Sequence, residues 1–528
     1  MAKPIPLSRA RLIKSVALMM TAALIGKALL VIREPIVAAY FGASAKTDAY
    51  NVAMVIVTML IGITVSPISD ILVPVYVERL HRDKKEGERF IRQTLTLYLL
   101  ILSSVLLVTY FAAPWLVRIY APGFASETSA LAMHLTRILA FFAAVSGLAG
   151  YFTMVLTAHQ EFLWVALGPI VTAAAVIVTL LAAASRLGIG ALAWGMVAGN
   201  AVQMLLLGLS TRRWTTRPWL DFRVGEAVRA LGRLSGWMLA GRFIGQGNDL
   251  IDRNMLSYLS EGSIAALGFA RSIYLLPFEI FTTGITRVII ANFSWDVAKG
   301  DVESLKQDLS LAIRMAAFFM IPVTVALIVL RHPIVQLLYQ RGAFDAVDVE
   351  ATATVLMFLS LGLYFRALTF IVGRIFISMQ SLVFPTVIAI GILAIHLVAN
   401  LALIPALGLS GAAISLTIIE VVATIAYLAK TRQMFGLMGG KRIAISLTKM
   451  GIASGVMAYV IFLLGRFLGG FLSGGSGLQL ITLAGMTFVG GLVYVASLYL
   501  SRSEELFLSI KLAKDTVSNW VAKEHVQC

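Results

Sequence analysis

Long apolar segments, separated by short hydrophilic ones, constrain this chain more than any other feature. A helix needs about 20 apolar residues to cross the hydrocarbon core of a bilayer. Of the 528 residues, 59% are hydrophobic and 13% are charged, with a mean hydropathy of +0.89, which is too apolar for a soluble protein of this length. The sequence therefore predicts an all-α polytopic membrane protein with about 14 transmembrane helices. The predicted spans are 13–41, 47–77, 93–117, 129–157, 162–184, 189–210, 233–259, 264–293, 308–330, 349–378, 382–404, 409–429, 444–469 and 478–500.

Basic residues concentrate in hydrophilic segments on one predicted side of the membrane. The chain has 43 Lys and Arg residues against 27 Asp and Glu residues. The cations gather in 78–92, 211–233, 430–442 and the tail after Ser501. This is the positive-inside pattern, so we expect both termini in the cytoplasm and no nucleic-acid binding. The single cysteine, Cys528, leaves no intrachain disulfide and no cysteine-based metal site.

The chain also matches itself at a shift of about 220 residues. IGKALLVIRE at 25–34 aligns with IGQGNDLIDR at 244–253, and Leu187-Gly188 aligns with Leu407-Gly408. Because the predicted copies start six spans apart, they have the same orientation, as in the parallel repeats of many transporters. We therefore expect two pseudo-symmetric six-helix lobes followed by two extra helices. The predicted domains are an N-terminal lobe (1–211), a basic cytoplasmic linker (212–232), a C-terminal lobe (233–432), two extra helices (433–501) and a cytoplasmic tail (502–528).

Charged residues interrupt the first predicted spans. Lys27, Arg33 and Glu34 lie within the first span, and Asp48 lies near the start of the second. A charge at the centre of a transmembrane helix costs roughly 2.5–3.5 kcal/mol on insertion scales, so these side chains are not expected to face lipid. We predict that they face a wet interior cavity, with Lys27 and Glu34 on one helix face.

The second half of the repeat carries a related set of charges. Asp249, Asp252 and Arg253 follow one another at helical spacing, so Asp249 and Arg253 can pair, and Arg271 lies in the next span. Mixed charge with surplus cations suits an anionic cargo, because arginine binds phosphate with two parallel hydrogen bonds. We predict cargo binding by Lys27, Arg33, Arg253 and Arg271, and gating or cavity ion pairs from Glu34, Asp48, Asp249 and Asp252. Structural ion pairs at helix ends are the alternative for Arg33-Glu34 and Asp252-Arg253.

Other intramembrane polar residues favour simpler interpretations. Arg314 lies near the start of a span and is expected to extend to the membrane surface. His159, His396 and Glu420 are isolated in apolar sequence and are interpreted as packing residues, while Arg366 and Arg374 are candidates for cavity lining. No residue set has the spacing of a metal site, of a nucleophile with its base or of a phosphate-binding glycine loop, so we predict no catalysis and no cofactor.

Together these residues resemble the lipid II flippases of bacterial peptidoglycan synthesis, the MurJ or MviN family of the multidrug/oligosaccharidyl-lipid/polysaccharide exporter superfamily. The resemblance covers most of 20–435. The matching segments are Arg33-Glu34, Phe41-Gly42-Ala43, Thr47-Asp48-Ala49-Tyr50, Val73-Pro74-Val75, Ala121-Pro122-Gly123-Phe124, Phe162 with Pro169, Arg271 with Pro277, and Leu338-Tyr339-Gln340-Arg341-Gly342-Ala343-Phe344.

This resemblance implies two lobes around a cationic cavity, alternating access, and a groove for the lipid tail formed by the two extra helices of 433–501. It also implies movement of an undecaprenyl-pyrophosphate-linked disaccharide-pentapeptide to the outer leaflet of the bacterial cytoplasmic membrane. Arg33 and Arg271 match arginines of the family's cavity, and Lys27 stands where the family usually has arginine. The chain departs from the family pattern at 59–62, which is apolar where an arginine pair is typical, and at Ala270, where an acidic residue usually lies beside the eighth-helix arginine.

We expect the drive to be the membrane potential or an ion gradient, and the partners to be the lipid-linked glycan, membrane lipids and proteins of cell-wall synthesis. Three alternatives stay open. The cargo of a flippase could be another lipid-linked oligosaccharide, such as O-antigen or exopolysaccharide. A drug/cation antiporter would need a cavity dominated by acids. A scaffold for cell-wall enzymes would tolerate loss of every intramembrane charge.

Overall fold

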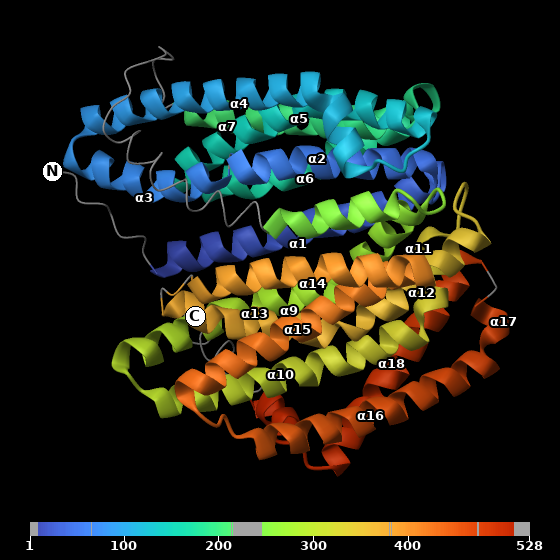
Figure 1. The fold of residues 1–528 in the computed structure, drawn as a ribbon. Coiled ribbons are helices and arrows are strands. Elements are labelled where there is room, and N and C mark those ends of the chain that lie inside the picture. Colours follow the sequence, from blue (N-terminus) through green and yellow to red (C-terminus); the bar gives the residue numbers. More distant parts are fainter. Residues whose placement is uncertain are drawn as a thin grey trace, which may run out of the picture. The chain divides into compact units, whose positions relative to one another are not determined.

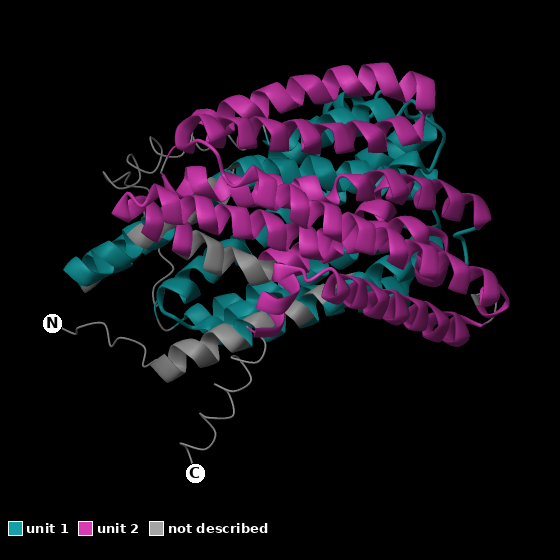
Figure 2. Cartoon of the chain, turned by 90° about the horizontal axis from the view of Figure 1, so that it is seen from below, with its two compact units in different colours: residues 1–265, 341–345 teal, residues 266–340, 346–528 magenta. Residues whose placement is uncertain are grey.

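The structure is a computed structural model that describes residues 9–64, 66–212, 214, 245–379, 381, 383–472 and 475–511. Throughout these residues the regular structure is helical, with no strand (Figure 1). Helices satisfy their own backbone hydrogen bonds, which is what a chain of long apolar segments needs in a solvent that offers no hydrogen-bonding partners. The chain divides into two compact units, which Figure 2 shows in different colours.

Unit 1 comprises Met1–Ala265 together with Arg341–Asp345. Within it, α5, α6 and α7 pack against one another, α4 and α2 pack on α5, and α1 packs on α6. Residues 245–256 are also helical. Its helices are α1 (Arg9–Phe41), α2 (Ala45–Thr64), α3 (Ser66–Arg82), α4 (Lys84–Tyr120), α5 (Ser126–Ala158), α6 (Phe162–Leu187) and α7 (Gly190–Thr211).

Unit 2 comprises Ala266–Gln340 and Ala346–Cys528. The helix α9 (Ser263–Lys299) begins in unit 1 and continues in unit 2. Within unit 2, α15 packs against α12, α13 and α14, while α16 packs against α10 and α18. The remaining helices are α10 (Val302–Val329), α11 (Arg331–Tyr339), α12 (Ala346–Leu361), α13 (Leu363–Ser378), α14 (Val383–Leu407), α15 (Leu409–Phe435), α16 (Gly440–Phe467), α17 (Gly469–Leu472) and α18 (Ser476–Leu500).

The described helices agree with the prediction of a polytopic membrane protein. Eleven are long and apolar enough to cross a membrane, or up to twelve if α12 and α13, bent by 43° at Gly362, form one span. The exact count of about 14 stays a prediction, because part of the chain is not described. The predicted span 47–77 is instead two helices. The second helix, α3, begins at Ser66, and the next residue is Pro67, which is favoured in the first turn of a helix.

The internal repeat extends to helix boundaries and caps. The α5 range corresponds to α12 and α13 taken together, and α6 and α7 correspond to α14 and α15. Gly188 and Gly408 end α6 and α14 with φ of 54° and 57°, a left-handed conformation that suits glycine. Asp83 and Asp301 cap α4 and α10 by accepting a hydrogen bond from a first-turn N–H. The predicted domain boundaries themselves stay predictions.

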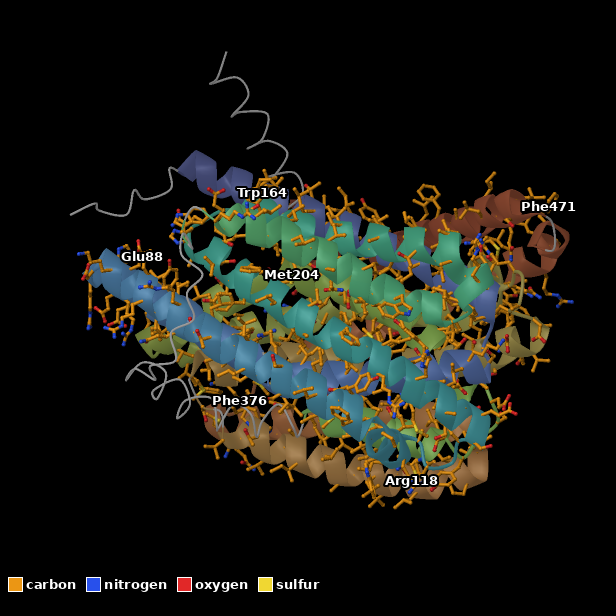
Figure 3. All side chains as sticks on the ribbon, turned by 90° about the horizontal axis from the view of Figure 1, so that it is seen from above. Glu88, Arg118, Trp164, Met204, Phe376 and Phe471 are labelled. Atoms are coloured by element: carbon orange, nitrogen blue, oxygen red, sulfur yellow. The ribbon has the colours of Figure 1, made fainter. Side chains whose placement is uncertain are left out.

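Small residues allow close helix packing in unit 1. Ideal Cβ atoms on Gly168 and Gly199 would lie 2.5 Å from the Gln203 side chain and 2.8 Å from the Thr172 carbonyl oxygen, so α6 and α7 approach each other closely there. Trp164 of α6 and Met204 of α7, labelled in Figure 3, belong to one apolar cluster. Figure 3 also shows Glu88 and Arg118 at opposite ends of α4, on either side of its apolar stretch.

The two C-terminal helices pack on the second repeat through an apolar cluster. Met450, Met457 and Ile461 of α16 and Tyr494 and Leu498 of α18 are buried together with residues of α10. The Tyr494 hydroxyl donates to the carbonyl oxygen of Phe318 at 2.9 Å. The helices outside the repeat are therefore built into unit 2.

Candidate functional site

The charged residues of α1 form a local pair. The Arg33 guanidinium contacts the carboxylate of its neighbour Glu34, and its Nε lies 3.2 Å from Glu34 Oε1. Both side chains are half-buried, with 21% exposed. The side chain of Lys27 lies outside the described part of the structure, so its predicted cargo-binding role stays a prediction.

Asp48 is buried, with 3% of its surface exposed, and it caps a helix. Its two carboxylate oxygens each accept a backbone hydrogen bond of 2.7 Å, from Gly262 N and Ala265 N at the start of α9. The first N–H groups of a helix have no partner within the helix, and the helix dipole favours a negative charge there. Asp48 therefore ties the start of α2 to the start of α9.

Other contacts extend this connection into a seam, which we define as residues 39–48, 119–123, 253–265 and 341–345 of unit 1. Ala343 N donates to Ala39 O at 2.8 Å, and Gly123 N donates to Ser257 Oγ at 3.0 Å. A Cβ on Gly342, where φ is 60°, would lie 2.2 Å from Ala39 O. The seam thus joins segments from both sequence repeats through backbone contacts. At Gly342 the two backbones are too close together for a side chain.

The predicted acidic and basic residues of the second repeat border this seam. Asp252 and Arg253 are buried, with 1% and 7% exposed, while Asp249 is half-buried. The charge of Arg253 acts on Asp48. The predicted pairing of Asp249 with Arg253, and the roles of these residues in gating or cargo binding, stay predictions.

Arg271 lies in a second group of charges, inside unit 2. It lines a small cavity of about 30 Å³ together with Tyr274, Arg366 and Glu420. Arg366 Nη1 donates to Glu420 Oε1 at 2.7 Å, and Tyr274 shares a side-chain hydrogen bond with Arg366. Glu420, interpreted as a packing residue rather than a proton relay, is not isolated in the structure. Its partner is 54 positions away in the sequence, so no local pattern reveals it.

Arginine–aromatic contacts extend this group along α13. The Arg366 guanidinium lies 4.9 Å from the centre of the Phe278 ring, and that of Arg374 lies 4.2 Å from the centre of the Phe370 ring. The two rings meet edge to face at 5.8 Å. Stacking on a ring fixes the plane of a guanidinium and leaves its N–H groups available to an oxyanion.

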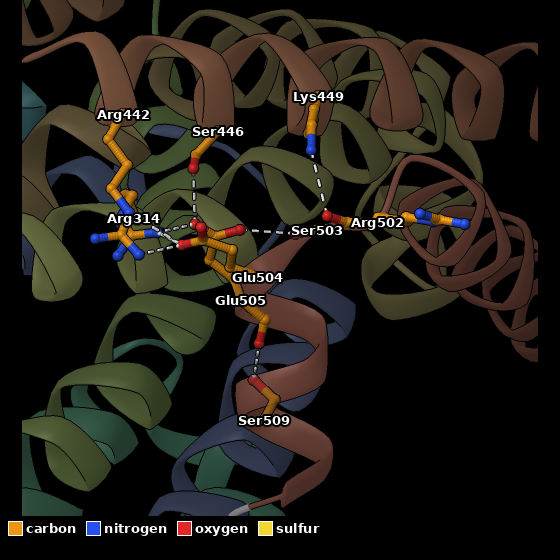
Figure 4. Close-up of polar contacts among 9 residues, drawn as sticks. All are labelled: Arg314, Arg442, Ser446, Lys449, Arg502, Ser503, Glu504, Glu505 and Ser509. Atoms are coloured by element: carbon orange, nitrogen blue, oxygen red, sulfur yellow. Dashed lines mark hydrogen bonds and ion pairs between the residues drawn. The ribbon is translucent and has the colours of Figure 1, made fainter.

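The third group lies where the chain leaves α18, and we call it the Arg314 cluster (Figure 4). Arg314 Nη1 donates to Glu505 Oε1 at 2.6 Å and to Glu504 Oε2 at 3.0 Å. Ser446 and Ser503 also donate to Glu505, each at 2.7 Å. The prediction that Arg314 extends to the membrane surface is wrong, because the residue is only 5% exposed and these carboxylates hold it inside.

Electrostatics in this cluster favour the charged carboxylates. Hydrogen bonds from Arg442, reinforced by those from Arg314, hold the pKa of Glu504 below its usual range. Burial alone would raise the pKa of Glu505, but the hydrogen bonds from Ser503 and Ser446 and the charge of Arg314 outweigh it and lower that pKa. The cluster is therefore a network of ion pairs between α10, α16 and the segment after α18.

No described residues form a cluster of three His, Cys, Asp or Glu side chains that could hold a metal ion. The polar groups found are ion pairs, helix caps and arginine–aromatic contacts. They can hold and release an anion or hold helices together, which are binding and positioning functions.

Comparison with known proteins identifies the family. The family model described as "Lipid II flippase MurJ" matches residues 37–482, most of the chain. This chain belongs to the MurJ lipid II flippase family. Its members are transporters rather than enzymes.

Two curated relatives show how far the MurJ resemblance extends. The chain is 26% identical over 480 residues to the "Probable lipid II flippase MurJ" of Thermotoga maritima, covering 90% of this chain and 93% of the relative. It is 25% identical over 395 residues to the "Lipid II flippase MurJ" of Burkholderia cenocepacia, covering 73% and 77%.

Solved structures support the same fold. A structure titled "Lipid II flippase MurJ, inward closed conformation" matches with a TM-score of 0.78 at 22% identity, covering 92% of this chain and 99% of that one. An inward-facing multidrug transporter of the MATE family and MOP superfamily matches with a TM-score of 0.66 at 15% identity, covering 78% and 95%. The MurJ match includes nearly the whole chain, so the predicted fold class is confirmed.

Proposed function

We propose that this chain moves lipid II, the undecaprenyl-pyrophosphate-linked precursor of peptidoglycan, from the inner to the outer leaflet of the bacterial cytoplasmic membrane by alternating access. The observation that carries the proposal is the MurJ family match over 37–482. Three arginines at half-buried positions in apolar helices, Arg33, Arg271 and Arg366, support it, because such cations are costly in a membrane and suit a phosphate-bearing cargo.

In this proposal the pyrophosphate binds Lys27, Arg33, Arg253 and Arg271, while the prenyl tail stays in the hydrocarbon beside α16 and α18. Glu34, Asp249 and Asp252 balance these cations before the cargo enters. Both termini lie in the cytoplasm, as the basic segments predict. Membrane lipids surround the spans, and proteins of cell-wall synthesis act before and after the transport step.

The seam is the proposed outer gate. With cytoplasmic termini, the turn before α2 and the turn before α9 lie on the outer side, so the seam closes that side while Asp48 caps α9. Release of the head group requires the seam to part, which breaks the two hydrogen bonds of Asp48 and the contact of Ala343 with Ala39. These are a few hydrogen bonds, each worth about 0.5–1.5 kcal/mol net, so a cargo-binding energy of ordinary size can shift the equilibrium.

The drive is the membrane potential or an ion gradient. With the cell interior negative, moving one negative charge outward across 100 mV is favourable by about 2.3 kcal/mol. Arginines that move with the cargo reduce this figure because they cancel part of its charge. No cofactor takes part in the proposed cycle.

The test is replacement of a bacterium's own lipid II flippase. We expect expression of this chain during depletion of that flippase to restore growth and the accessibility of lipid II at the outer leaflet. Arg33→Ala and Arg271→Ala are expected to abolish both, and Arg82→Ala, which changes a side chain that is 70% exposed, is the matched control. Rescue of growth by both cavity variants would exclude a role of these arginines in cargo binding. If the wild-type protein inserts into the membrane but does not restore growth, the cargo is another lipid-linked glycan.

A further inference from the structure

The cavity lined by Arg271, Arg366 and Glu420 contains two arginines and one carboxylate. Glu420 is 18% exposed and pairs directly with Arg366, which is 32% exposed. The charge of Arg271 also acts on Glu420. Tyr274 is buried and feels the charges of all three residues. The Glu420 carboxylate is therefore paired with Arg366 and lies within the electrostatic influence of Arg271.

The cavity is small compared with a phosphate group. A volume of about 30 Å³ has room for roughly one water molecule and not for a phosphate group. Leu359 and Leu416 are among its other lining residues, so the charges lie partly against apolar side chains. In such surroundings an arginine without a counter-ion would be costly, and Glu420 removes that cost.

Arg366 also contacts an aromatic ring, and so does Arg374 further along α13. Phe278 lies under the Arg366 guanidinium, and Arg374 follows two helical turns later with its own ring, Phe370. The N–H groups of a stacked guanidinium point outward in its plane, where they match both carboxylate and phosphate.

We propose that Glu420 is an internal counter-ion that occupies Arg366 and Arg271 when cargo is absent and gives them up to the pyrophosphate of the cargo. This proposal rests on the proposed function and specifies how its site releases a charged ligand. Two arginines facing a dianion without competition would hold it tightly and turn over slowly. Return of the Glu420 carboxylate to Arg366 competes with the phosphate and pairs that arginine again after release. Glu420 thus acts on the cargo only through Arg366 and Arg271.

The test uses the purified full-length protein in lipid nanodiscs with undecaprenyl pyrophosphate as the probe. Glu420→Gln keeps the shape and one hydrogen-bond acceptor for Arg366 while it removes the competing charge. We expect it to bind the probe at least about tenfold more tightly, equivalent to about 1.4 kcal/mol. In cells, the same variant should deliver less lipid II to the outer leaflet. Arg366→Gln should weaken binding about tenfold.

Tighter binding with slower turnover distinguishes this role from a purely structural one. Loss of a structural ion pair would weaken binding and transport together. Glu350→Gln, at a carboxylate that is 68% exposed and pairs with His332, is the matched control and should change neither. Unchanged or weaker probe binding by a folded Glu420→Gln protein overturns the proposal.

A second comparison applies if the Glu420→Gln protein does not fold. In the Arg366→Gln background, adding Glu420→Gln removes both charges of the pair, and we expect the double variant to bind the probe more tightly than Arg366→Gln alone. Equal or weaker binding by the double variant overturns the proposal. Failure of the wild type to bind the probe and to replace a lipid II flippase would instead overturn the proposed function.

Discussion

Replacing Glu505 with alanine is expected to destabilise the packing of the C-terminal helices on unit 2. Its carboxylate is 1% exposed and accepts three side-chain hydrogen bonds, from Arg314, Ser446 and Ser503. Breaking a buried ion pair typically costs about 3–5 kcal/mol, because the remaining charge stays buried. Arg314 keeps its second partner, Glu504, so we expect a loss at the lower end, about 3 kcal/mol.

Glu504→Ala is the matched control, one residue away. Its side chain is 59% exposed, and an exposed ion pair is worth at most about 1 kcal/mol. Thermal unfolding of the purified variants in detergent measures the stability loss caused by each substitution. For a chain longer than 250 residues we take about 1–2 °C per kcal/mol, so Glu505→Ala should lower the Tm by about 3–6 °C and Glu504→Ala by at most about 2 °C.

The pH dependence gives an independent check with a defined sign. The folded-state pKa of Glu505 lies below its ordinary value of 4.5, so the stabilisation is complete above pH 4.5 and is lost as the pH falls through the lower, folded-state pKa. The Tm difference between wild type and Glu505→Gln should stay constant from pH 7 to pH 5 and shrink below pH 4.5. Equal Tm losses for the alanine variants of Glu504 and Glu505, or a difference that grows in acid, would refute the reasoning.

Three further predictions concern unit 1. Gly342→Ala should abolish rescue of a flippase-depleted strain, because its Cβ would meet Ala39 O at 2.2 Å. The control Gly408→Ala in unit 2, at a similar φ but with nothing within 4 Å, should keep rescue and cost about 1–3 kcal/mol of backbone strain. Asp48→Asn can accept through one oxygen only, so we expect a stability loss of about 1–2 kcal/mol, seen as a lower Tm, and weaker rescue. Burial lowers the pKa of His159, so its contribution to stability is present above pH 6.5 and falls in acid, and His159→Gln should flatten the Tm profile between pH 7 and pH 5.

Hydrophobic patterning and glycine position were sufficient to predict most of the fold. Apolar length places the spans, and the matched Leu-Gly pairs at 187–188 and 407–408 mark turns that the structure contains at both places. These features depend on residues close together in sequence. Breaks within spans were missed, as at 361–363, because apolar composition does not change where a helix bends.

The polar contacts were harder to predict because their partners lie far apart in sequence. Glu420 and Arg314 each look isolated in an apolar segment, yet their partners are 54 and about 190 positions away. The N–H groups that Asp48 caps are further still, 214 and 217 positions along the chain. Arg33 and Glu34 are adjacent in the sequence, and theirs is the one described ion pair of this kind that could be predicted from the sequence.

The partners of the buried acids also bear on the choice between an anionic and a cationic cargo. An antiporter for cations needs carboxylates that are available to the cargo, and in this structure Asp48 binds two backbone N–H groups while Glu420 binds an arginine. Separating either acid from its partner leaves a buried donor or charge without compensation, which a weakly bound cation could not offset. In the proposed exchange an anionic cargo faces the opposite situation, because it would replace Glu420 at Arg366 with another oxyanion and leave the arginine paired. The partners of Asp48 and Glu420 therefore favour a phosphate-bearing cargo for reasons separate from the family match.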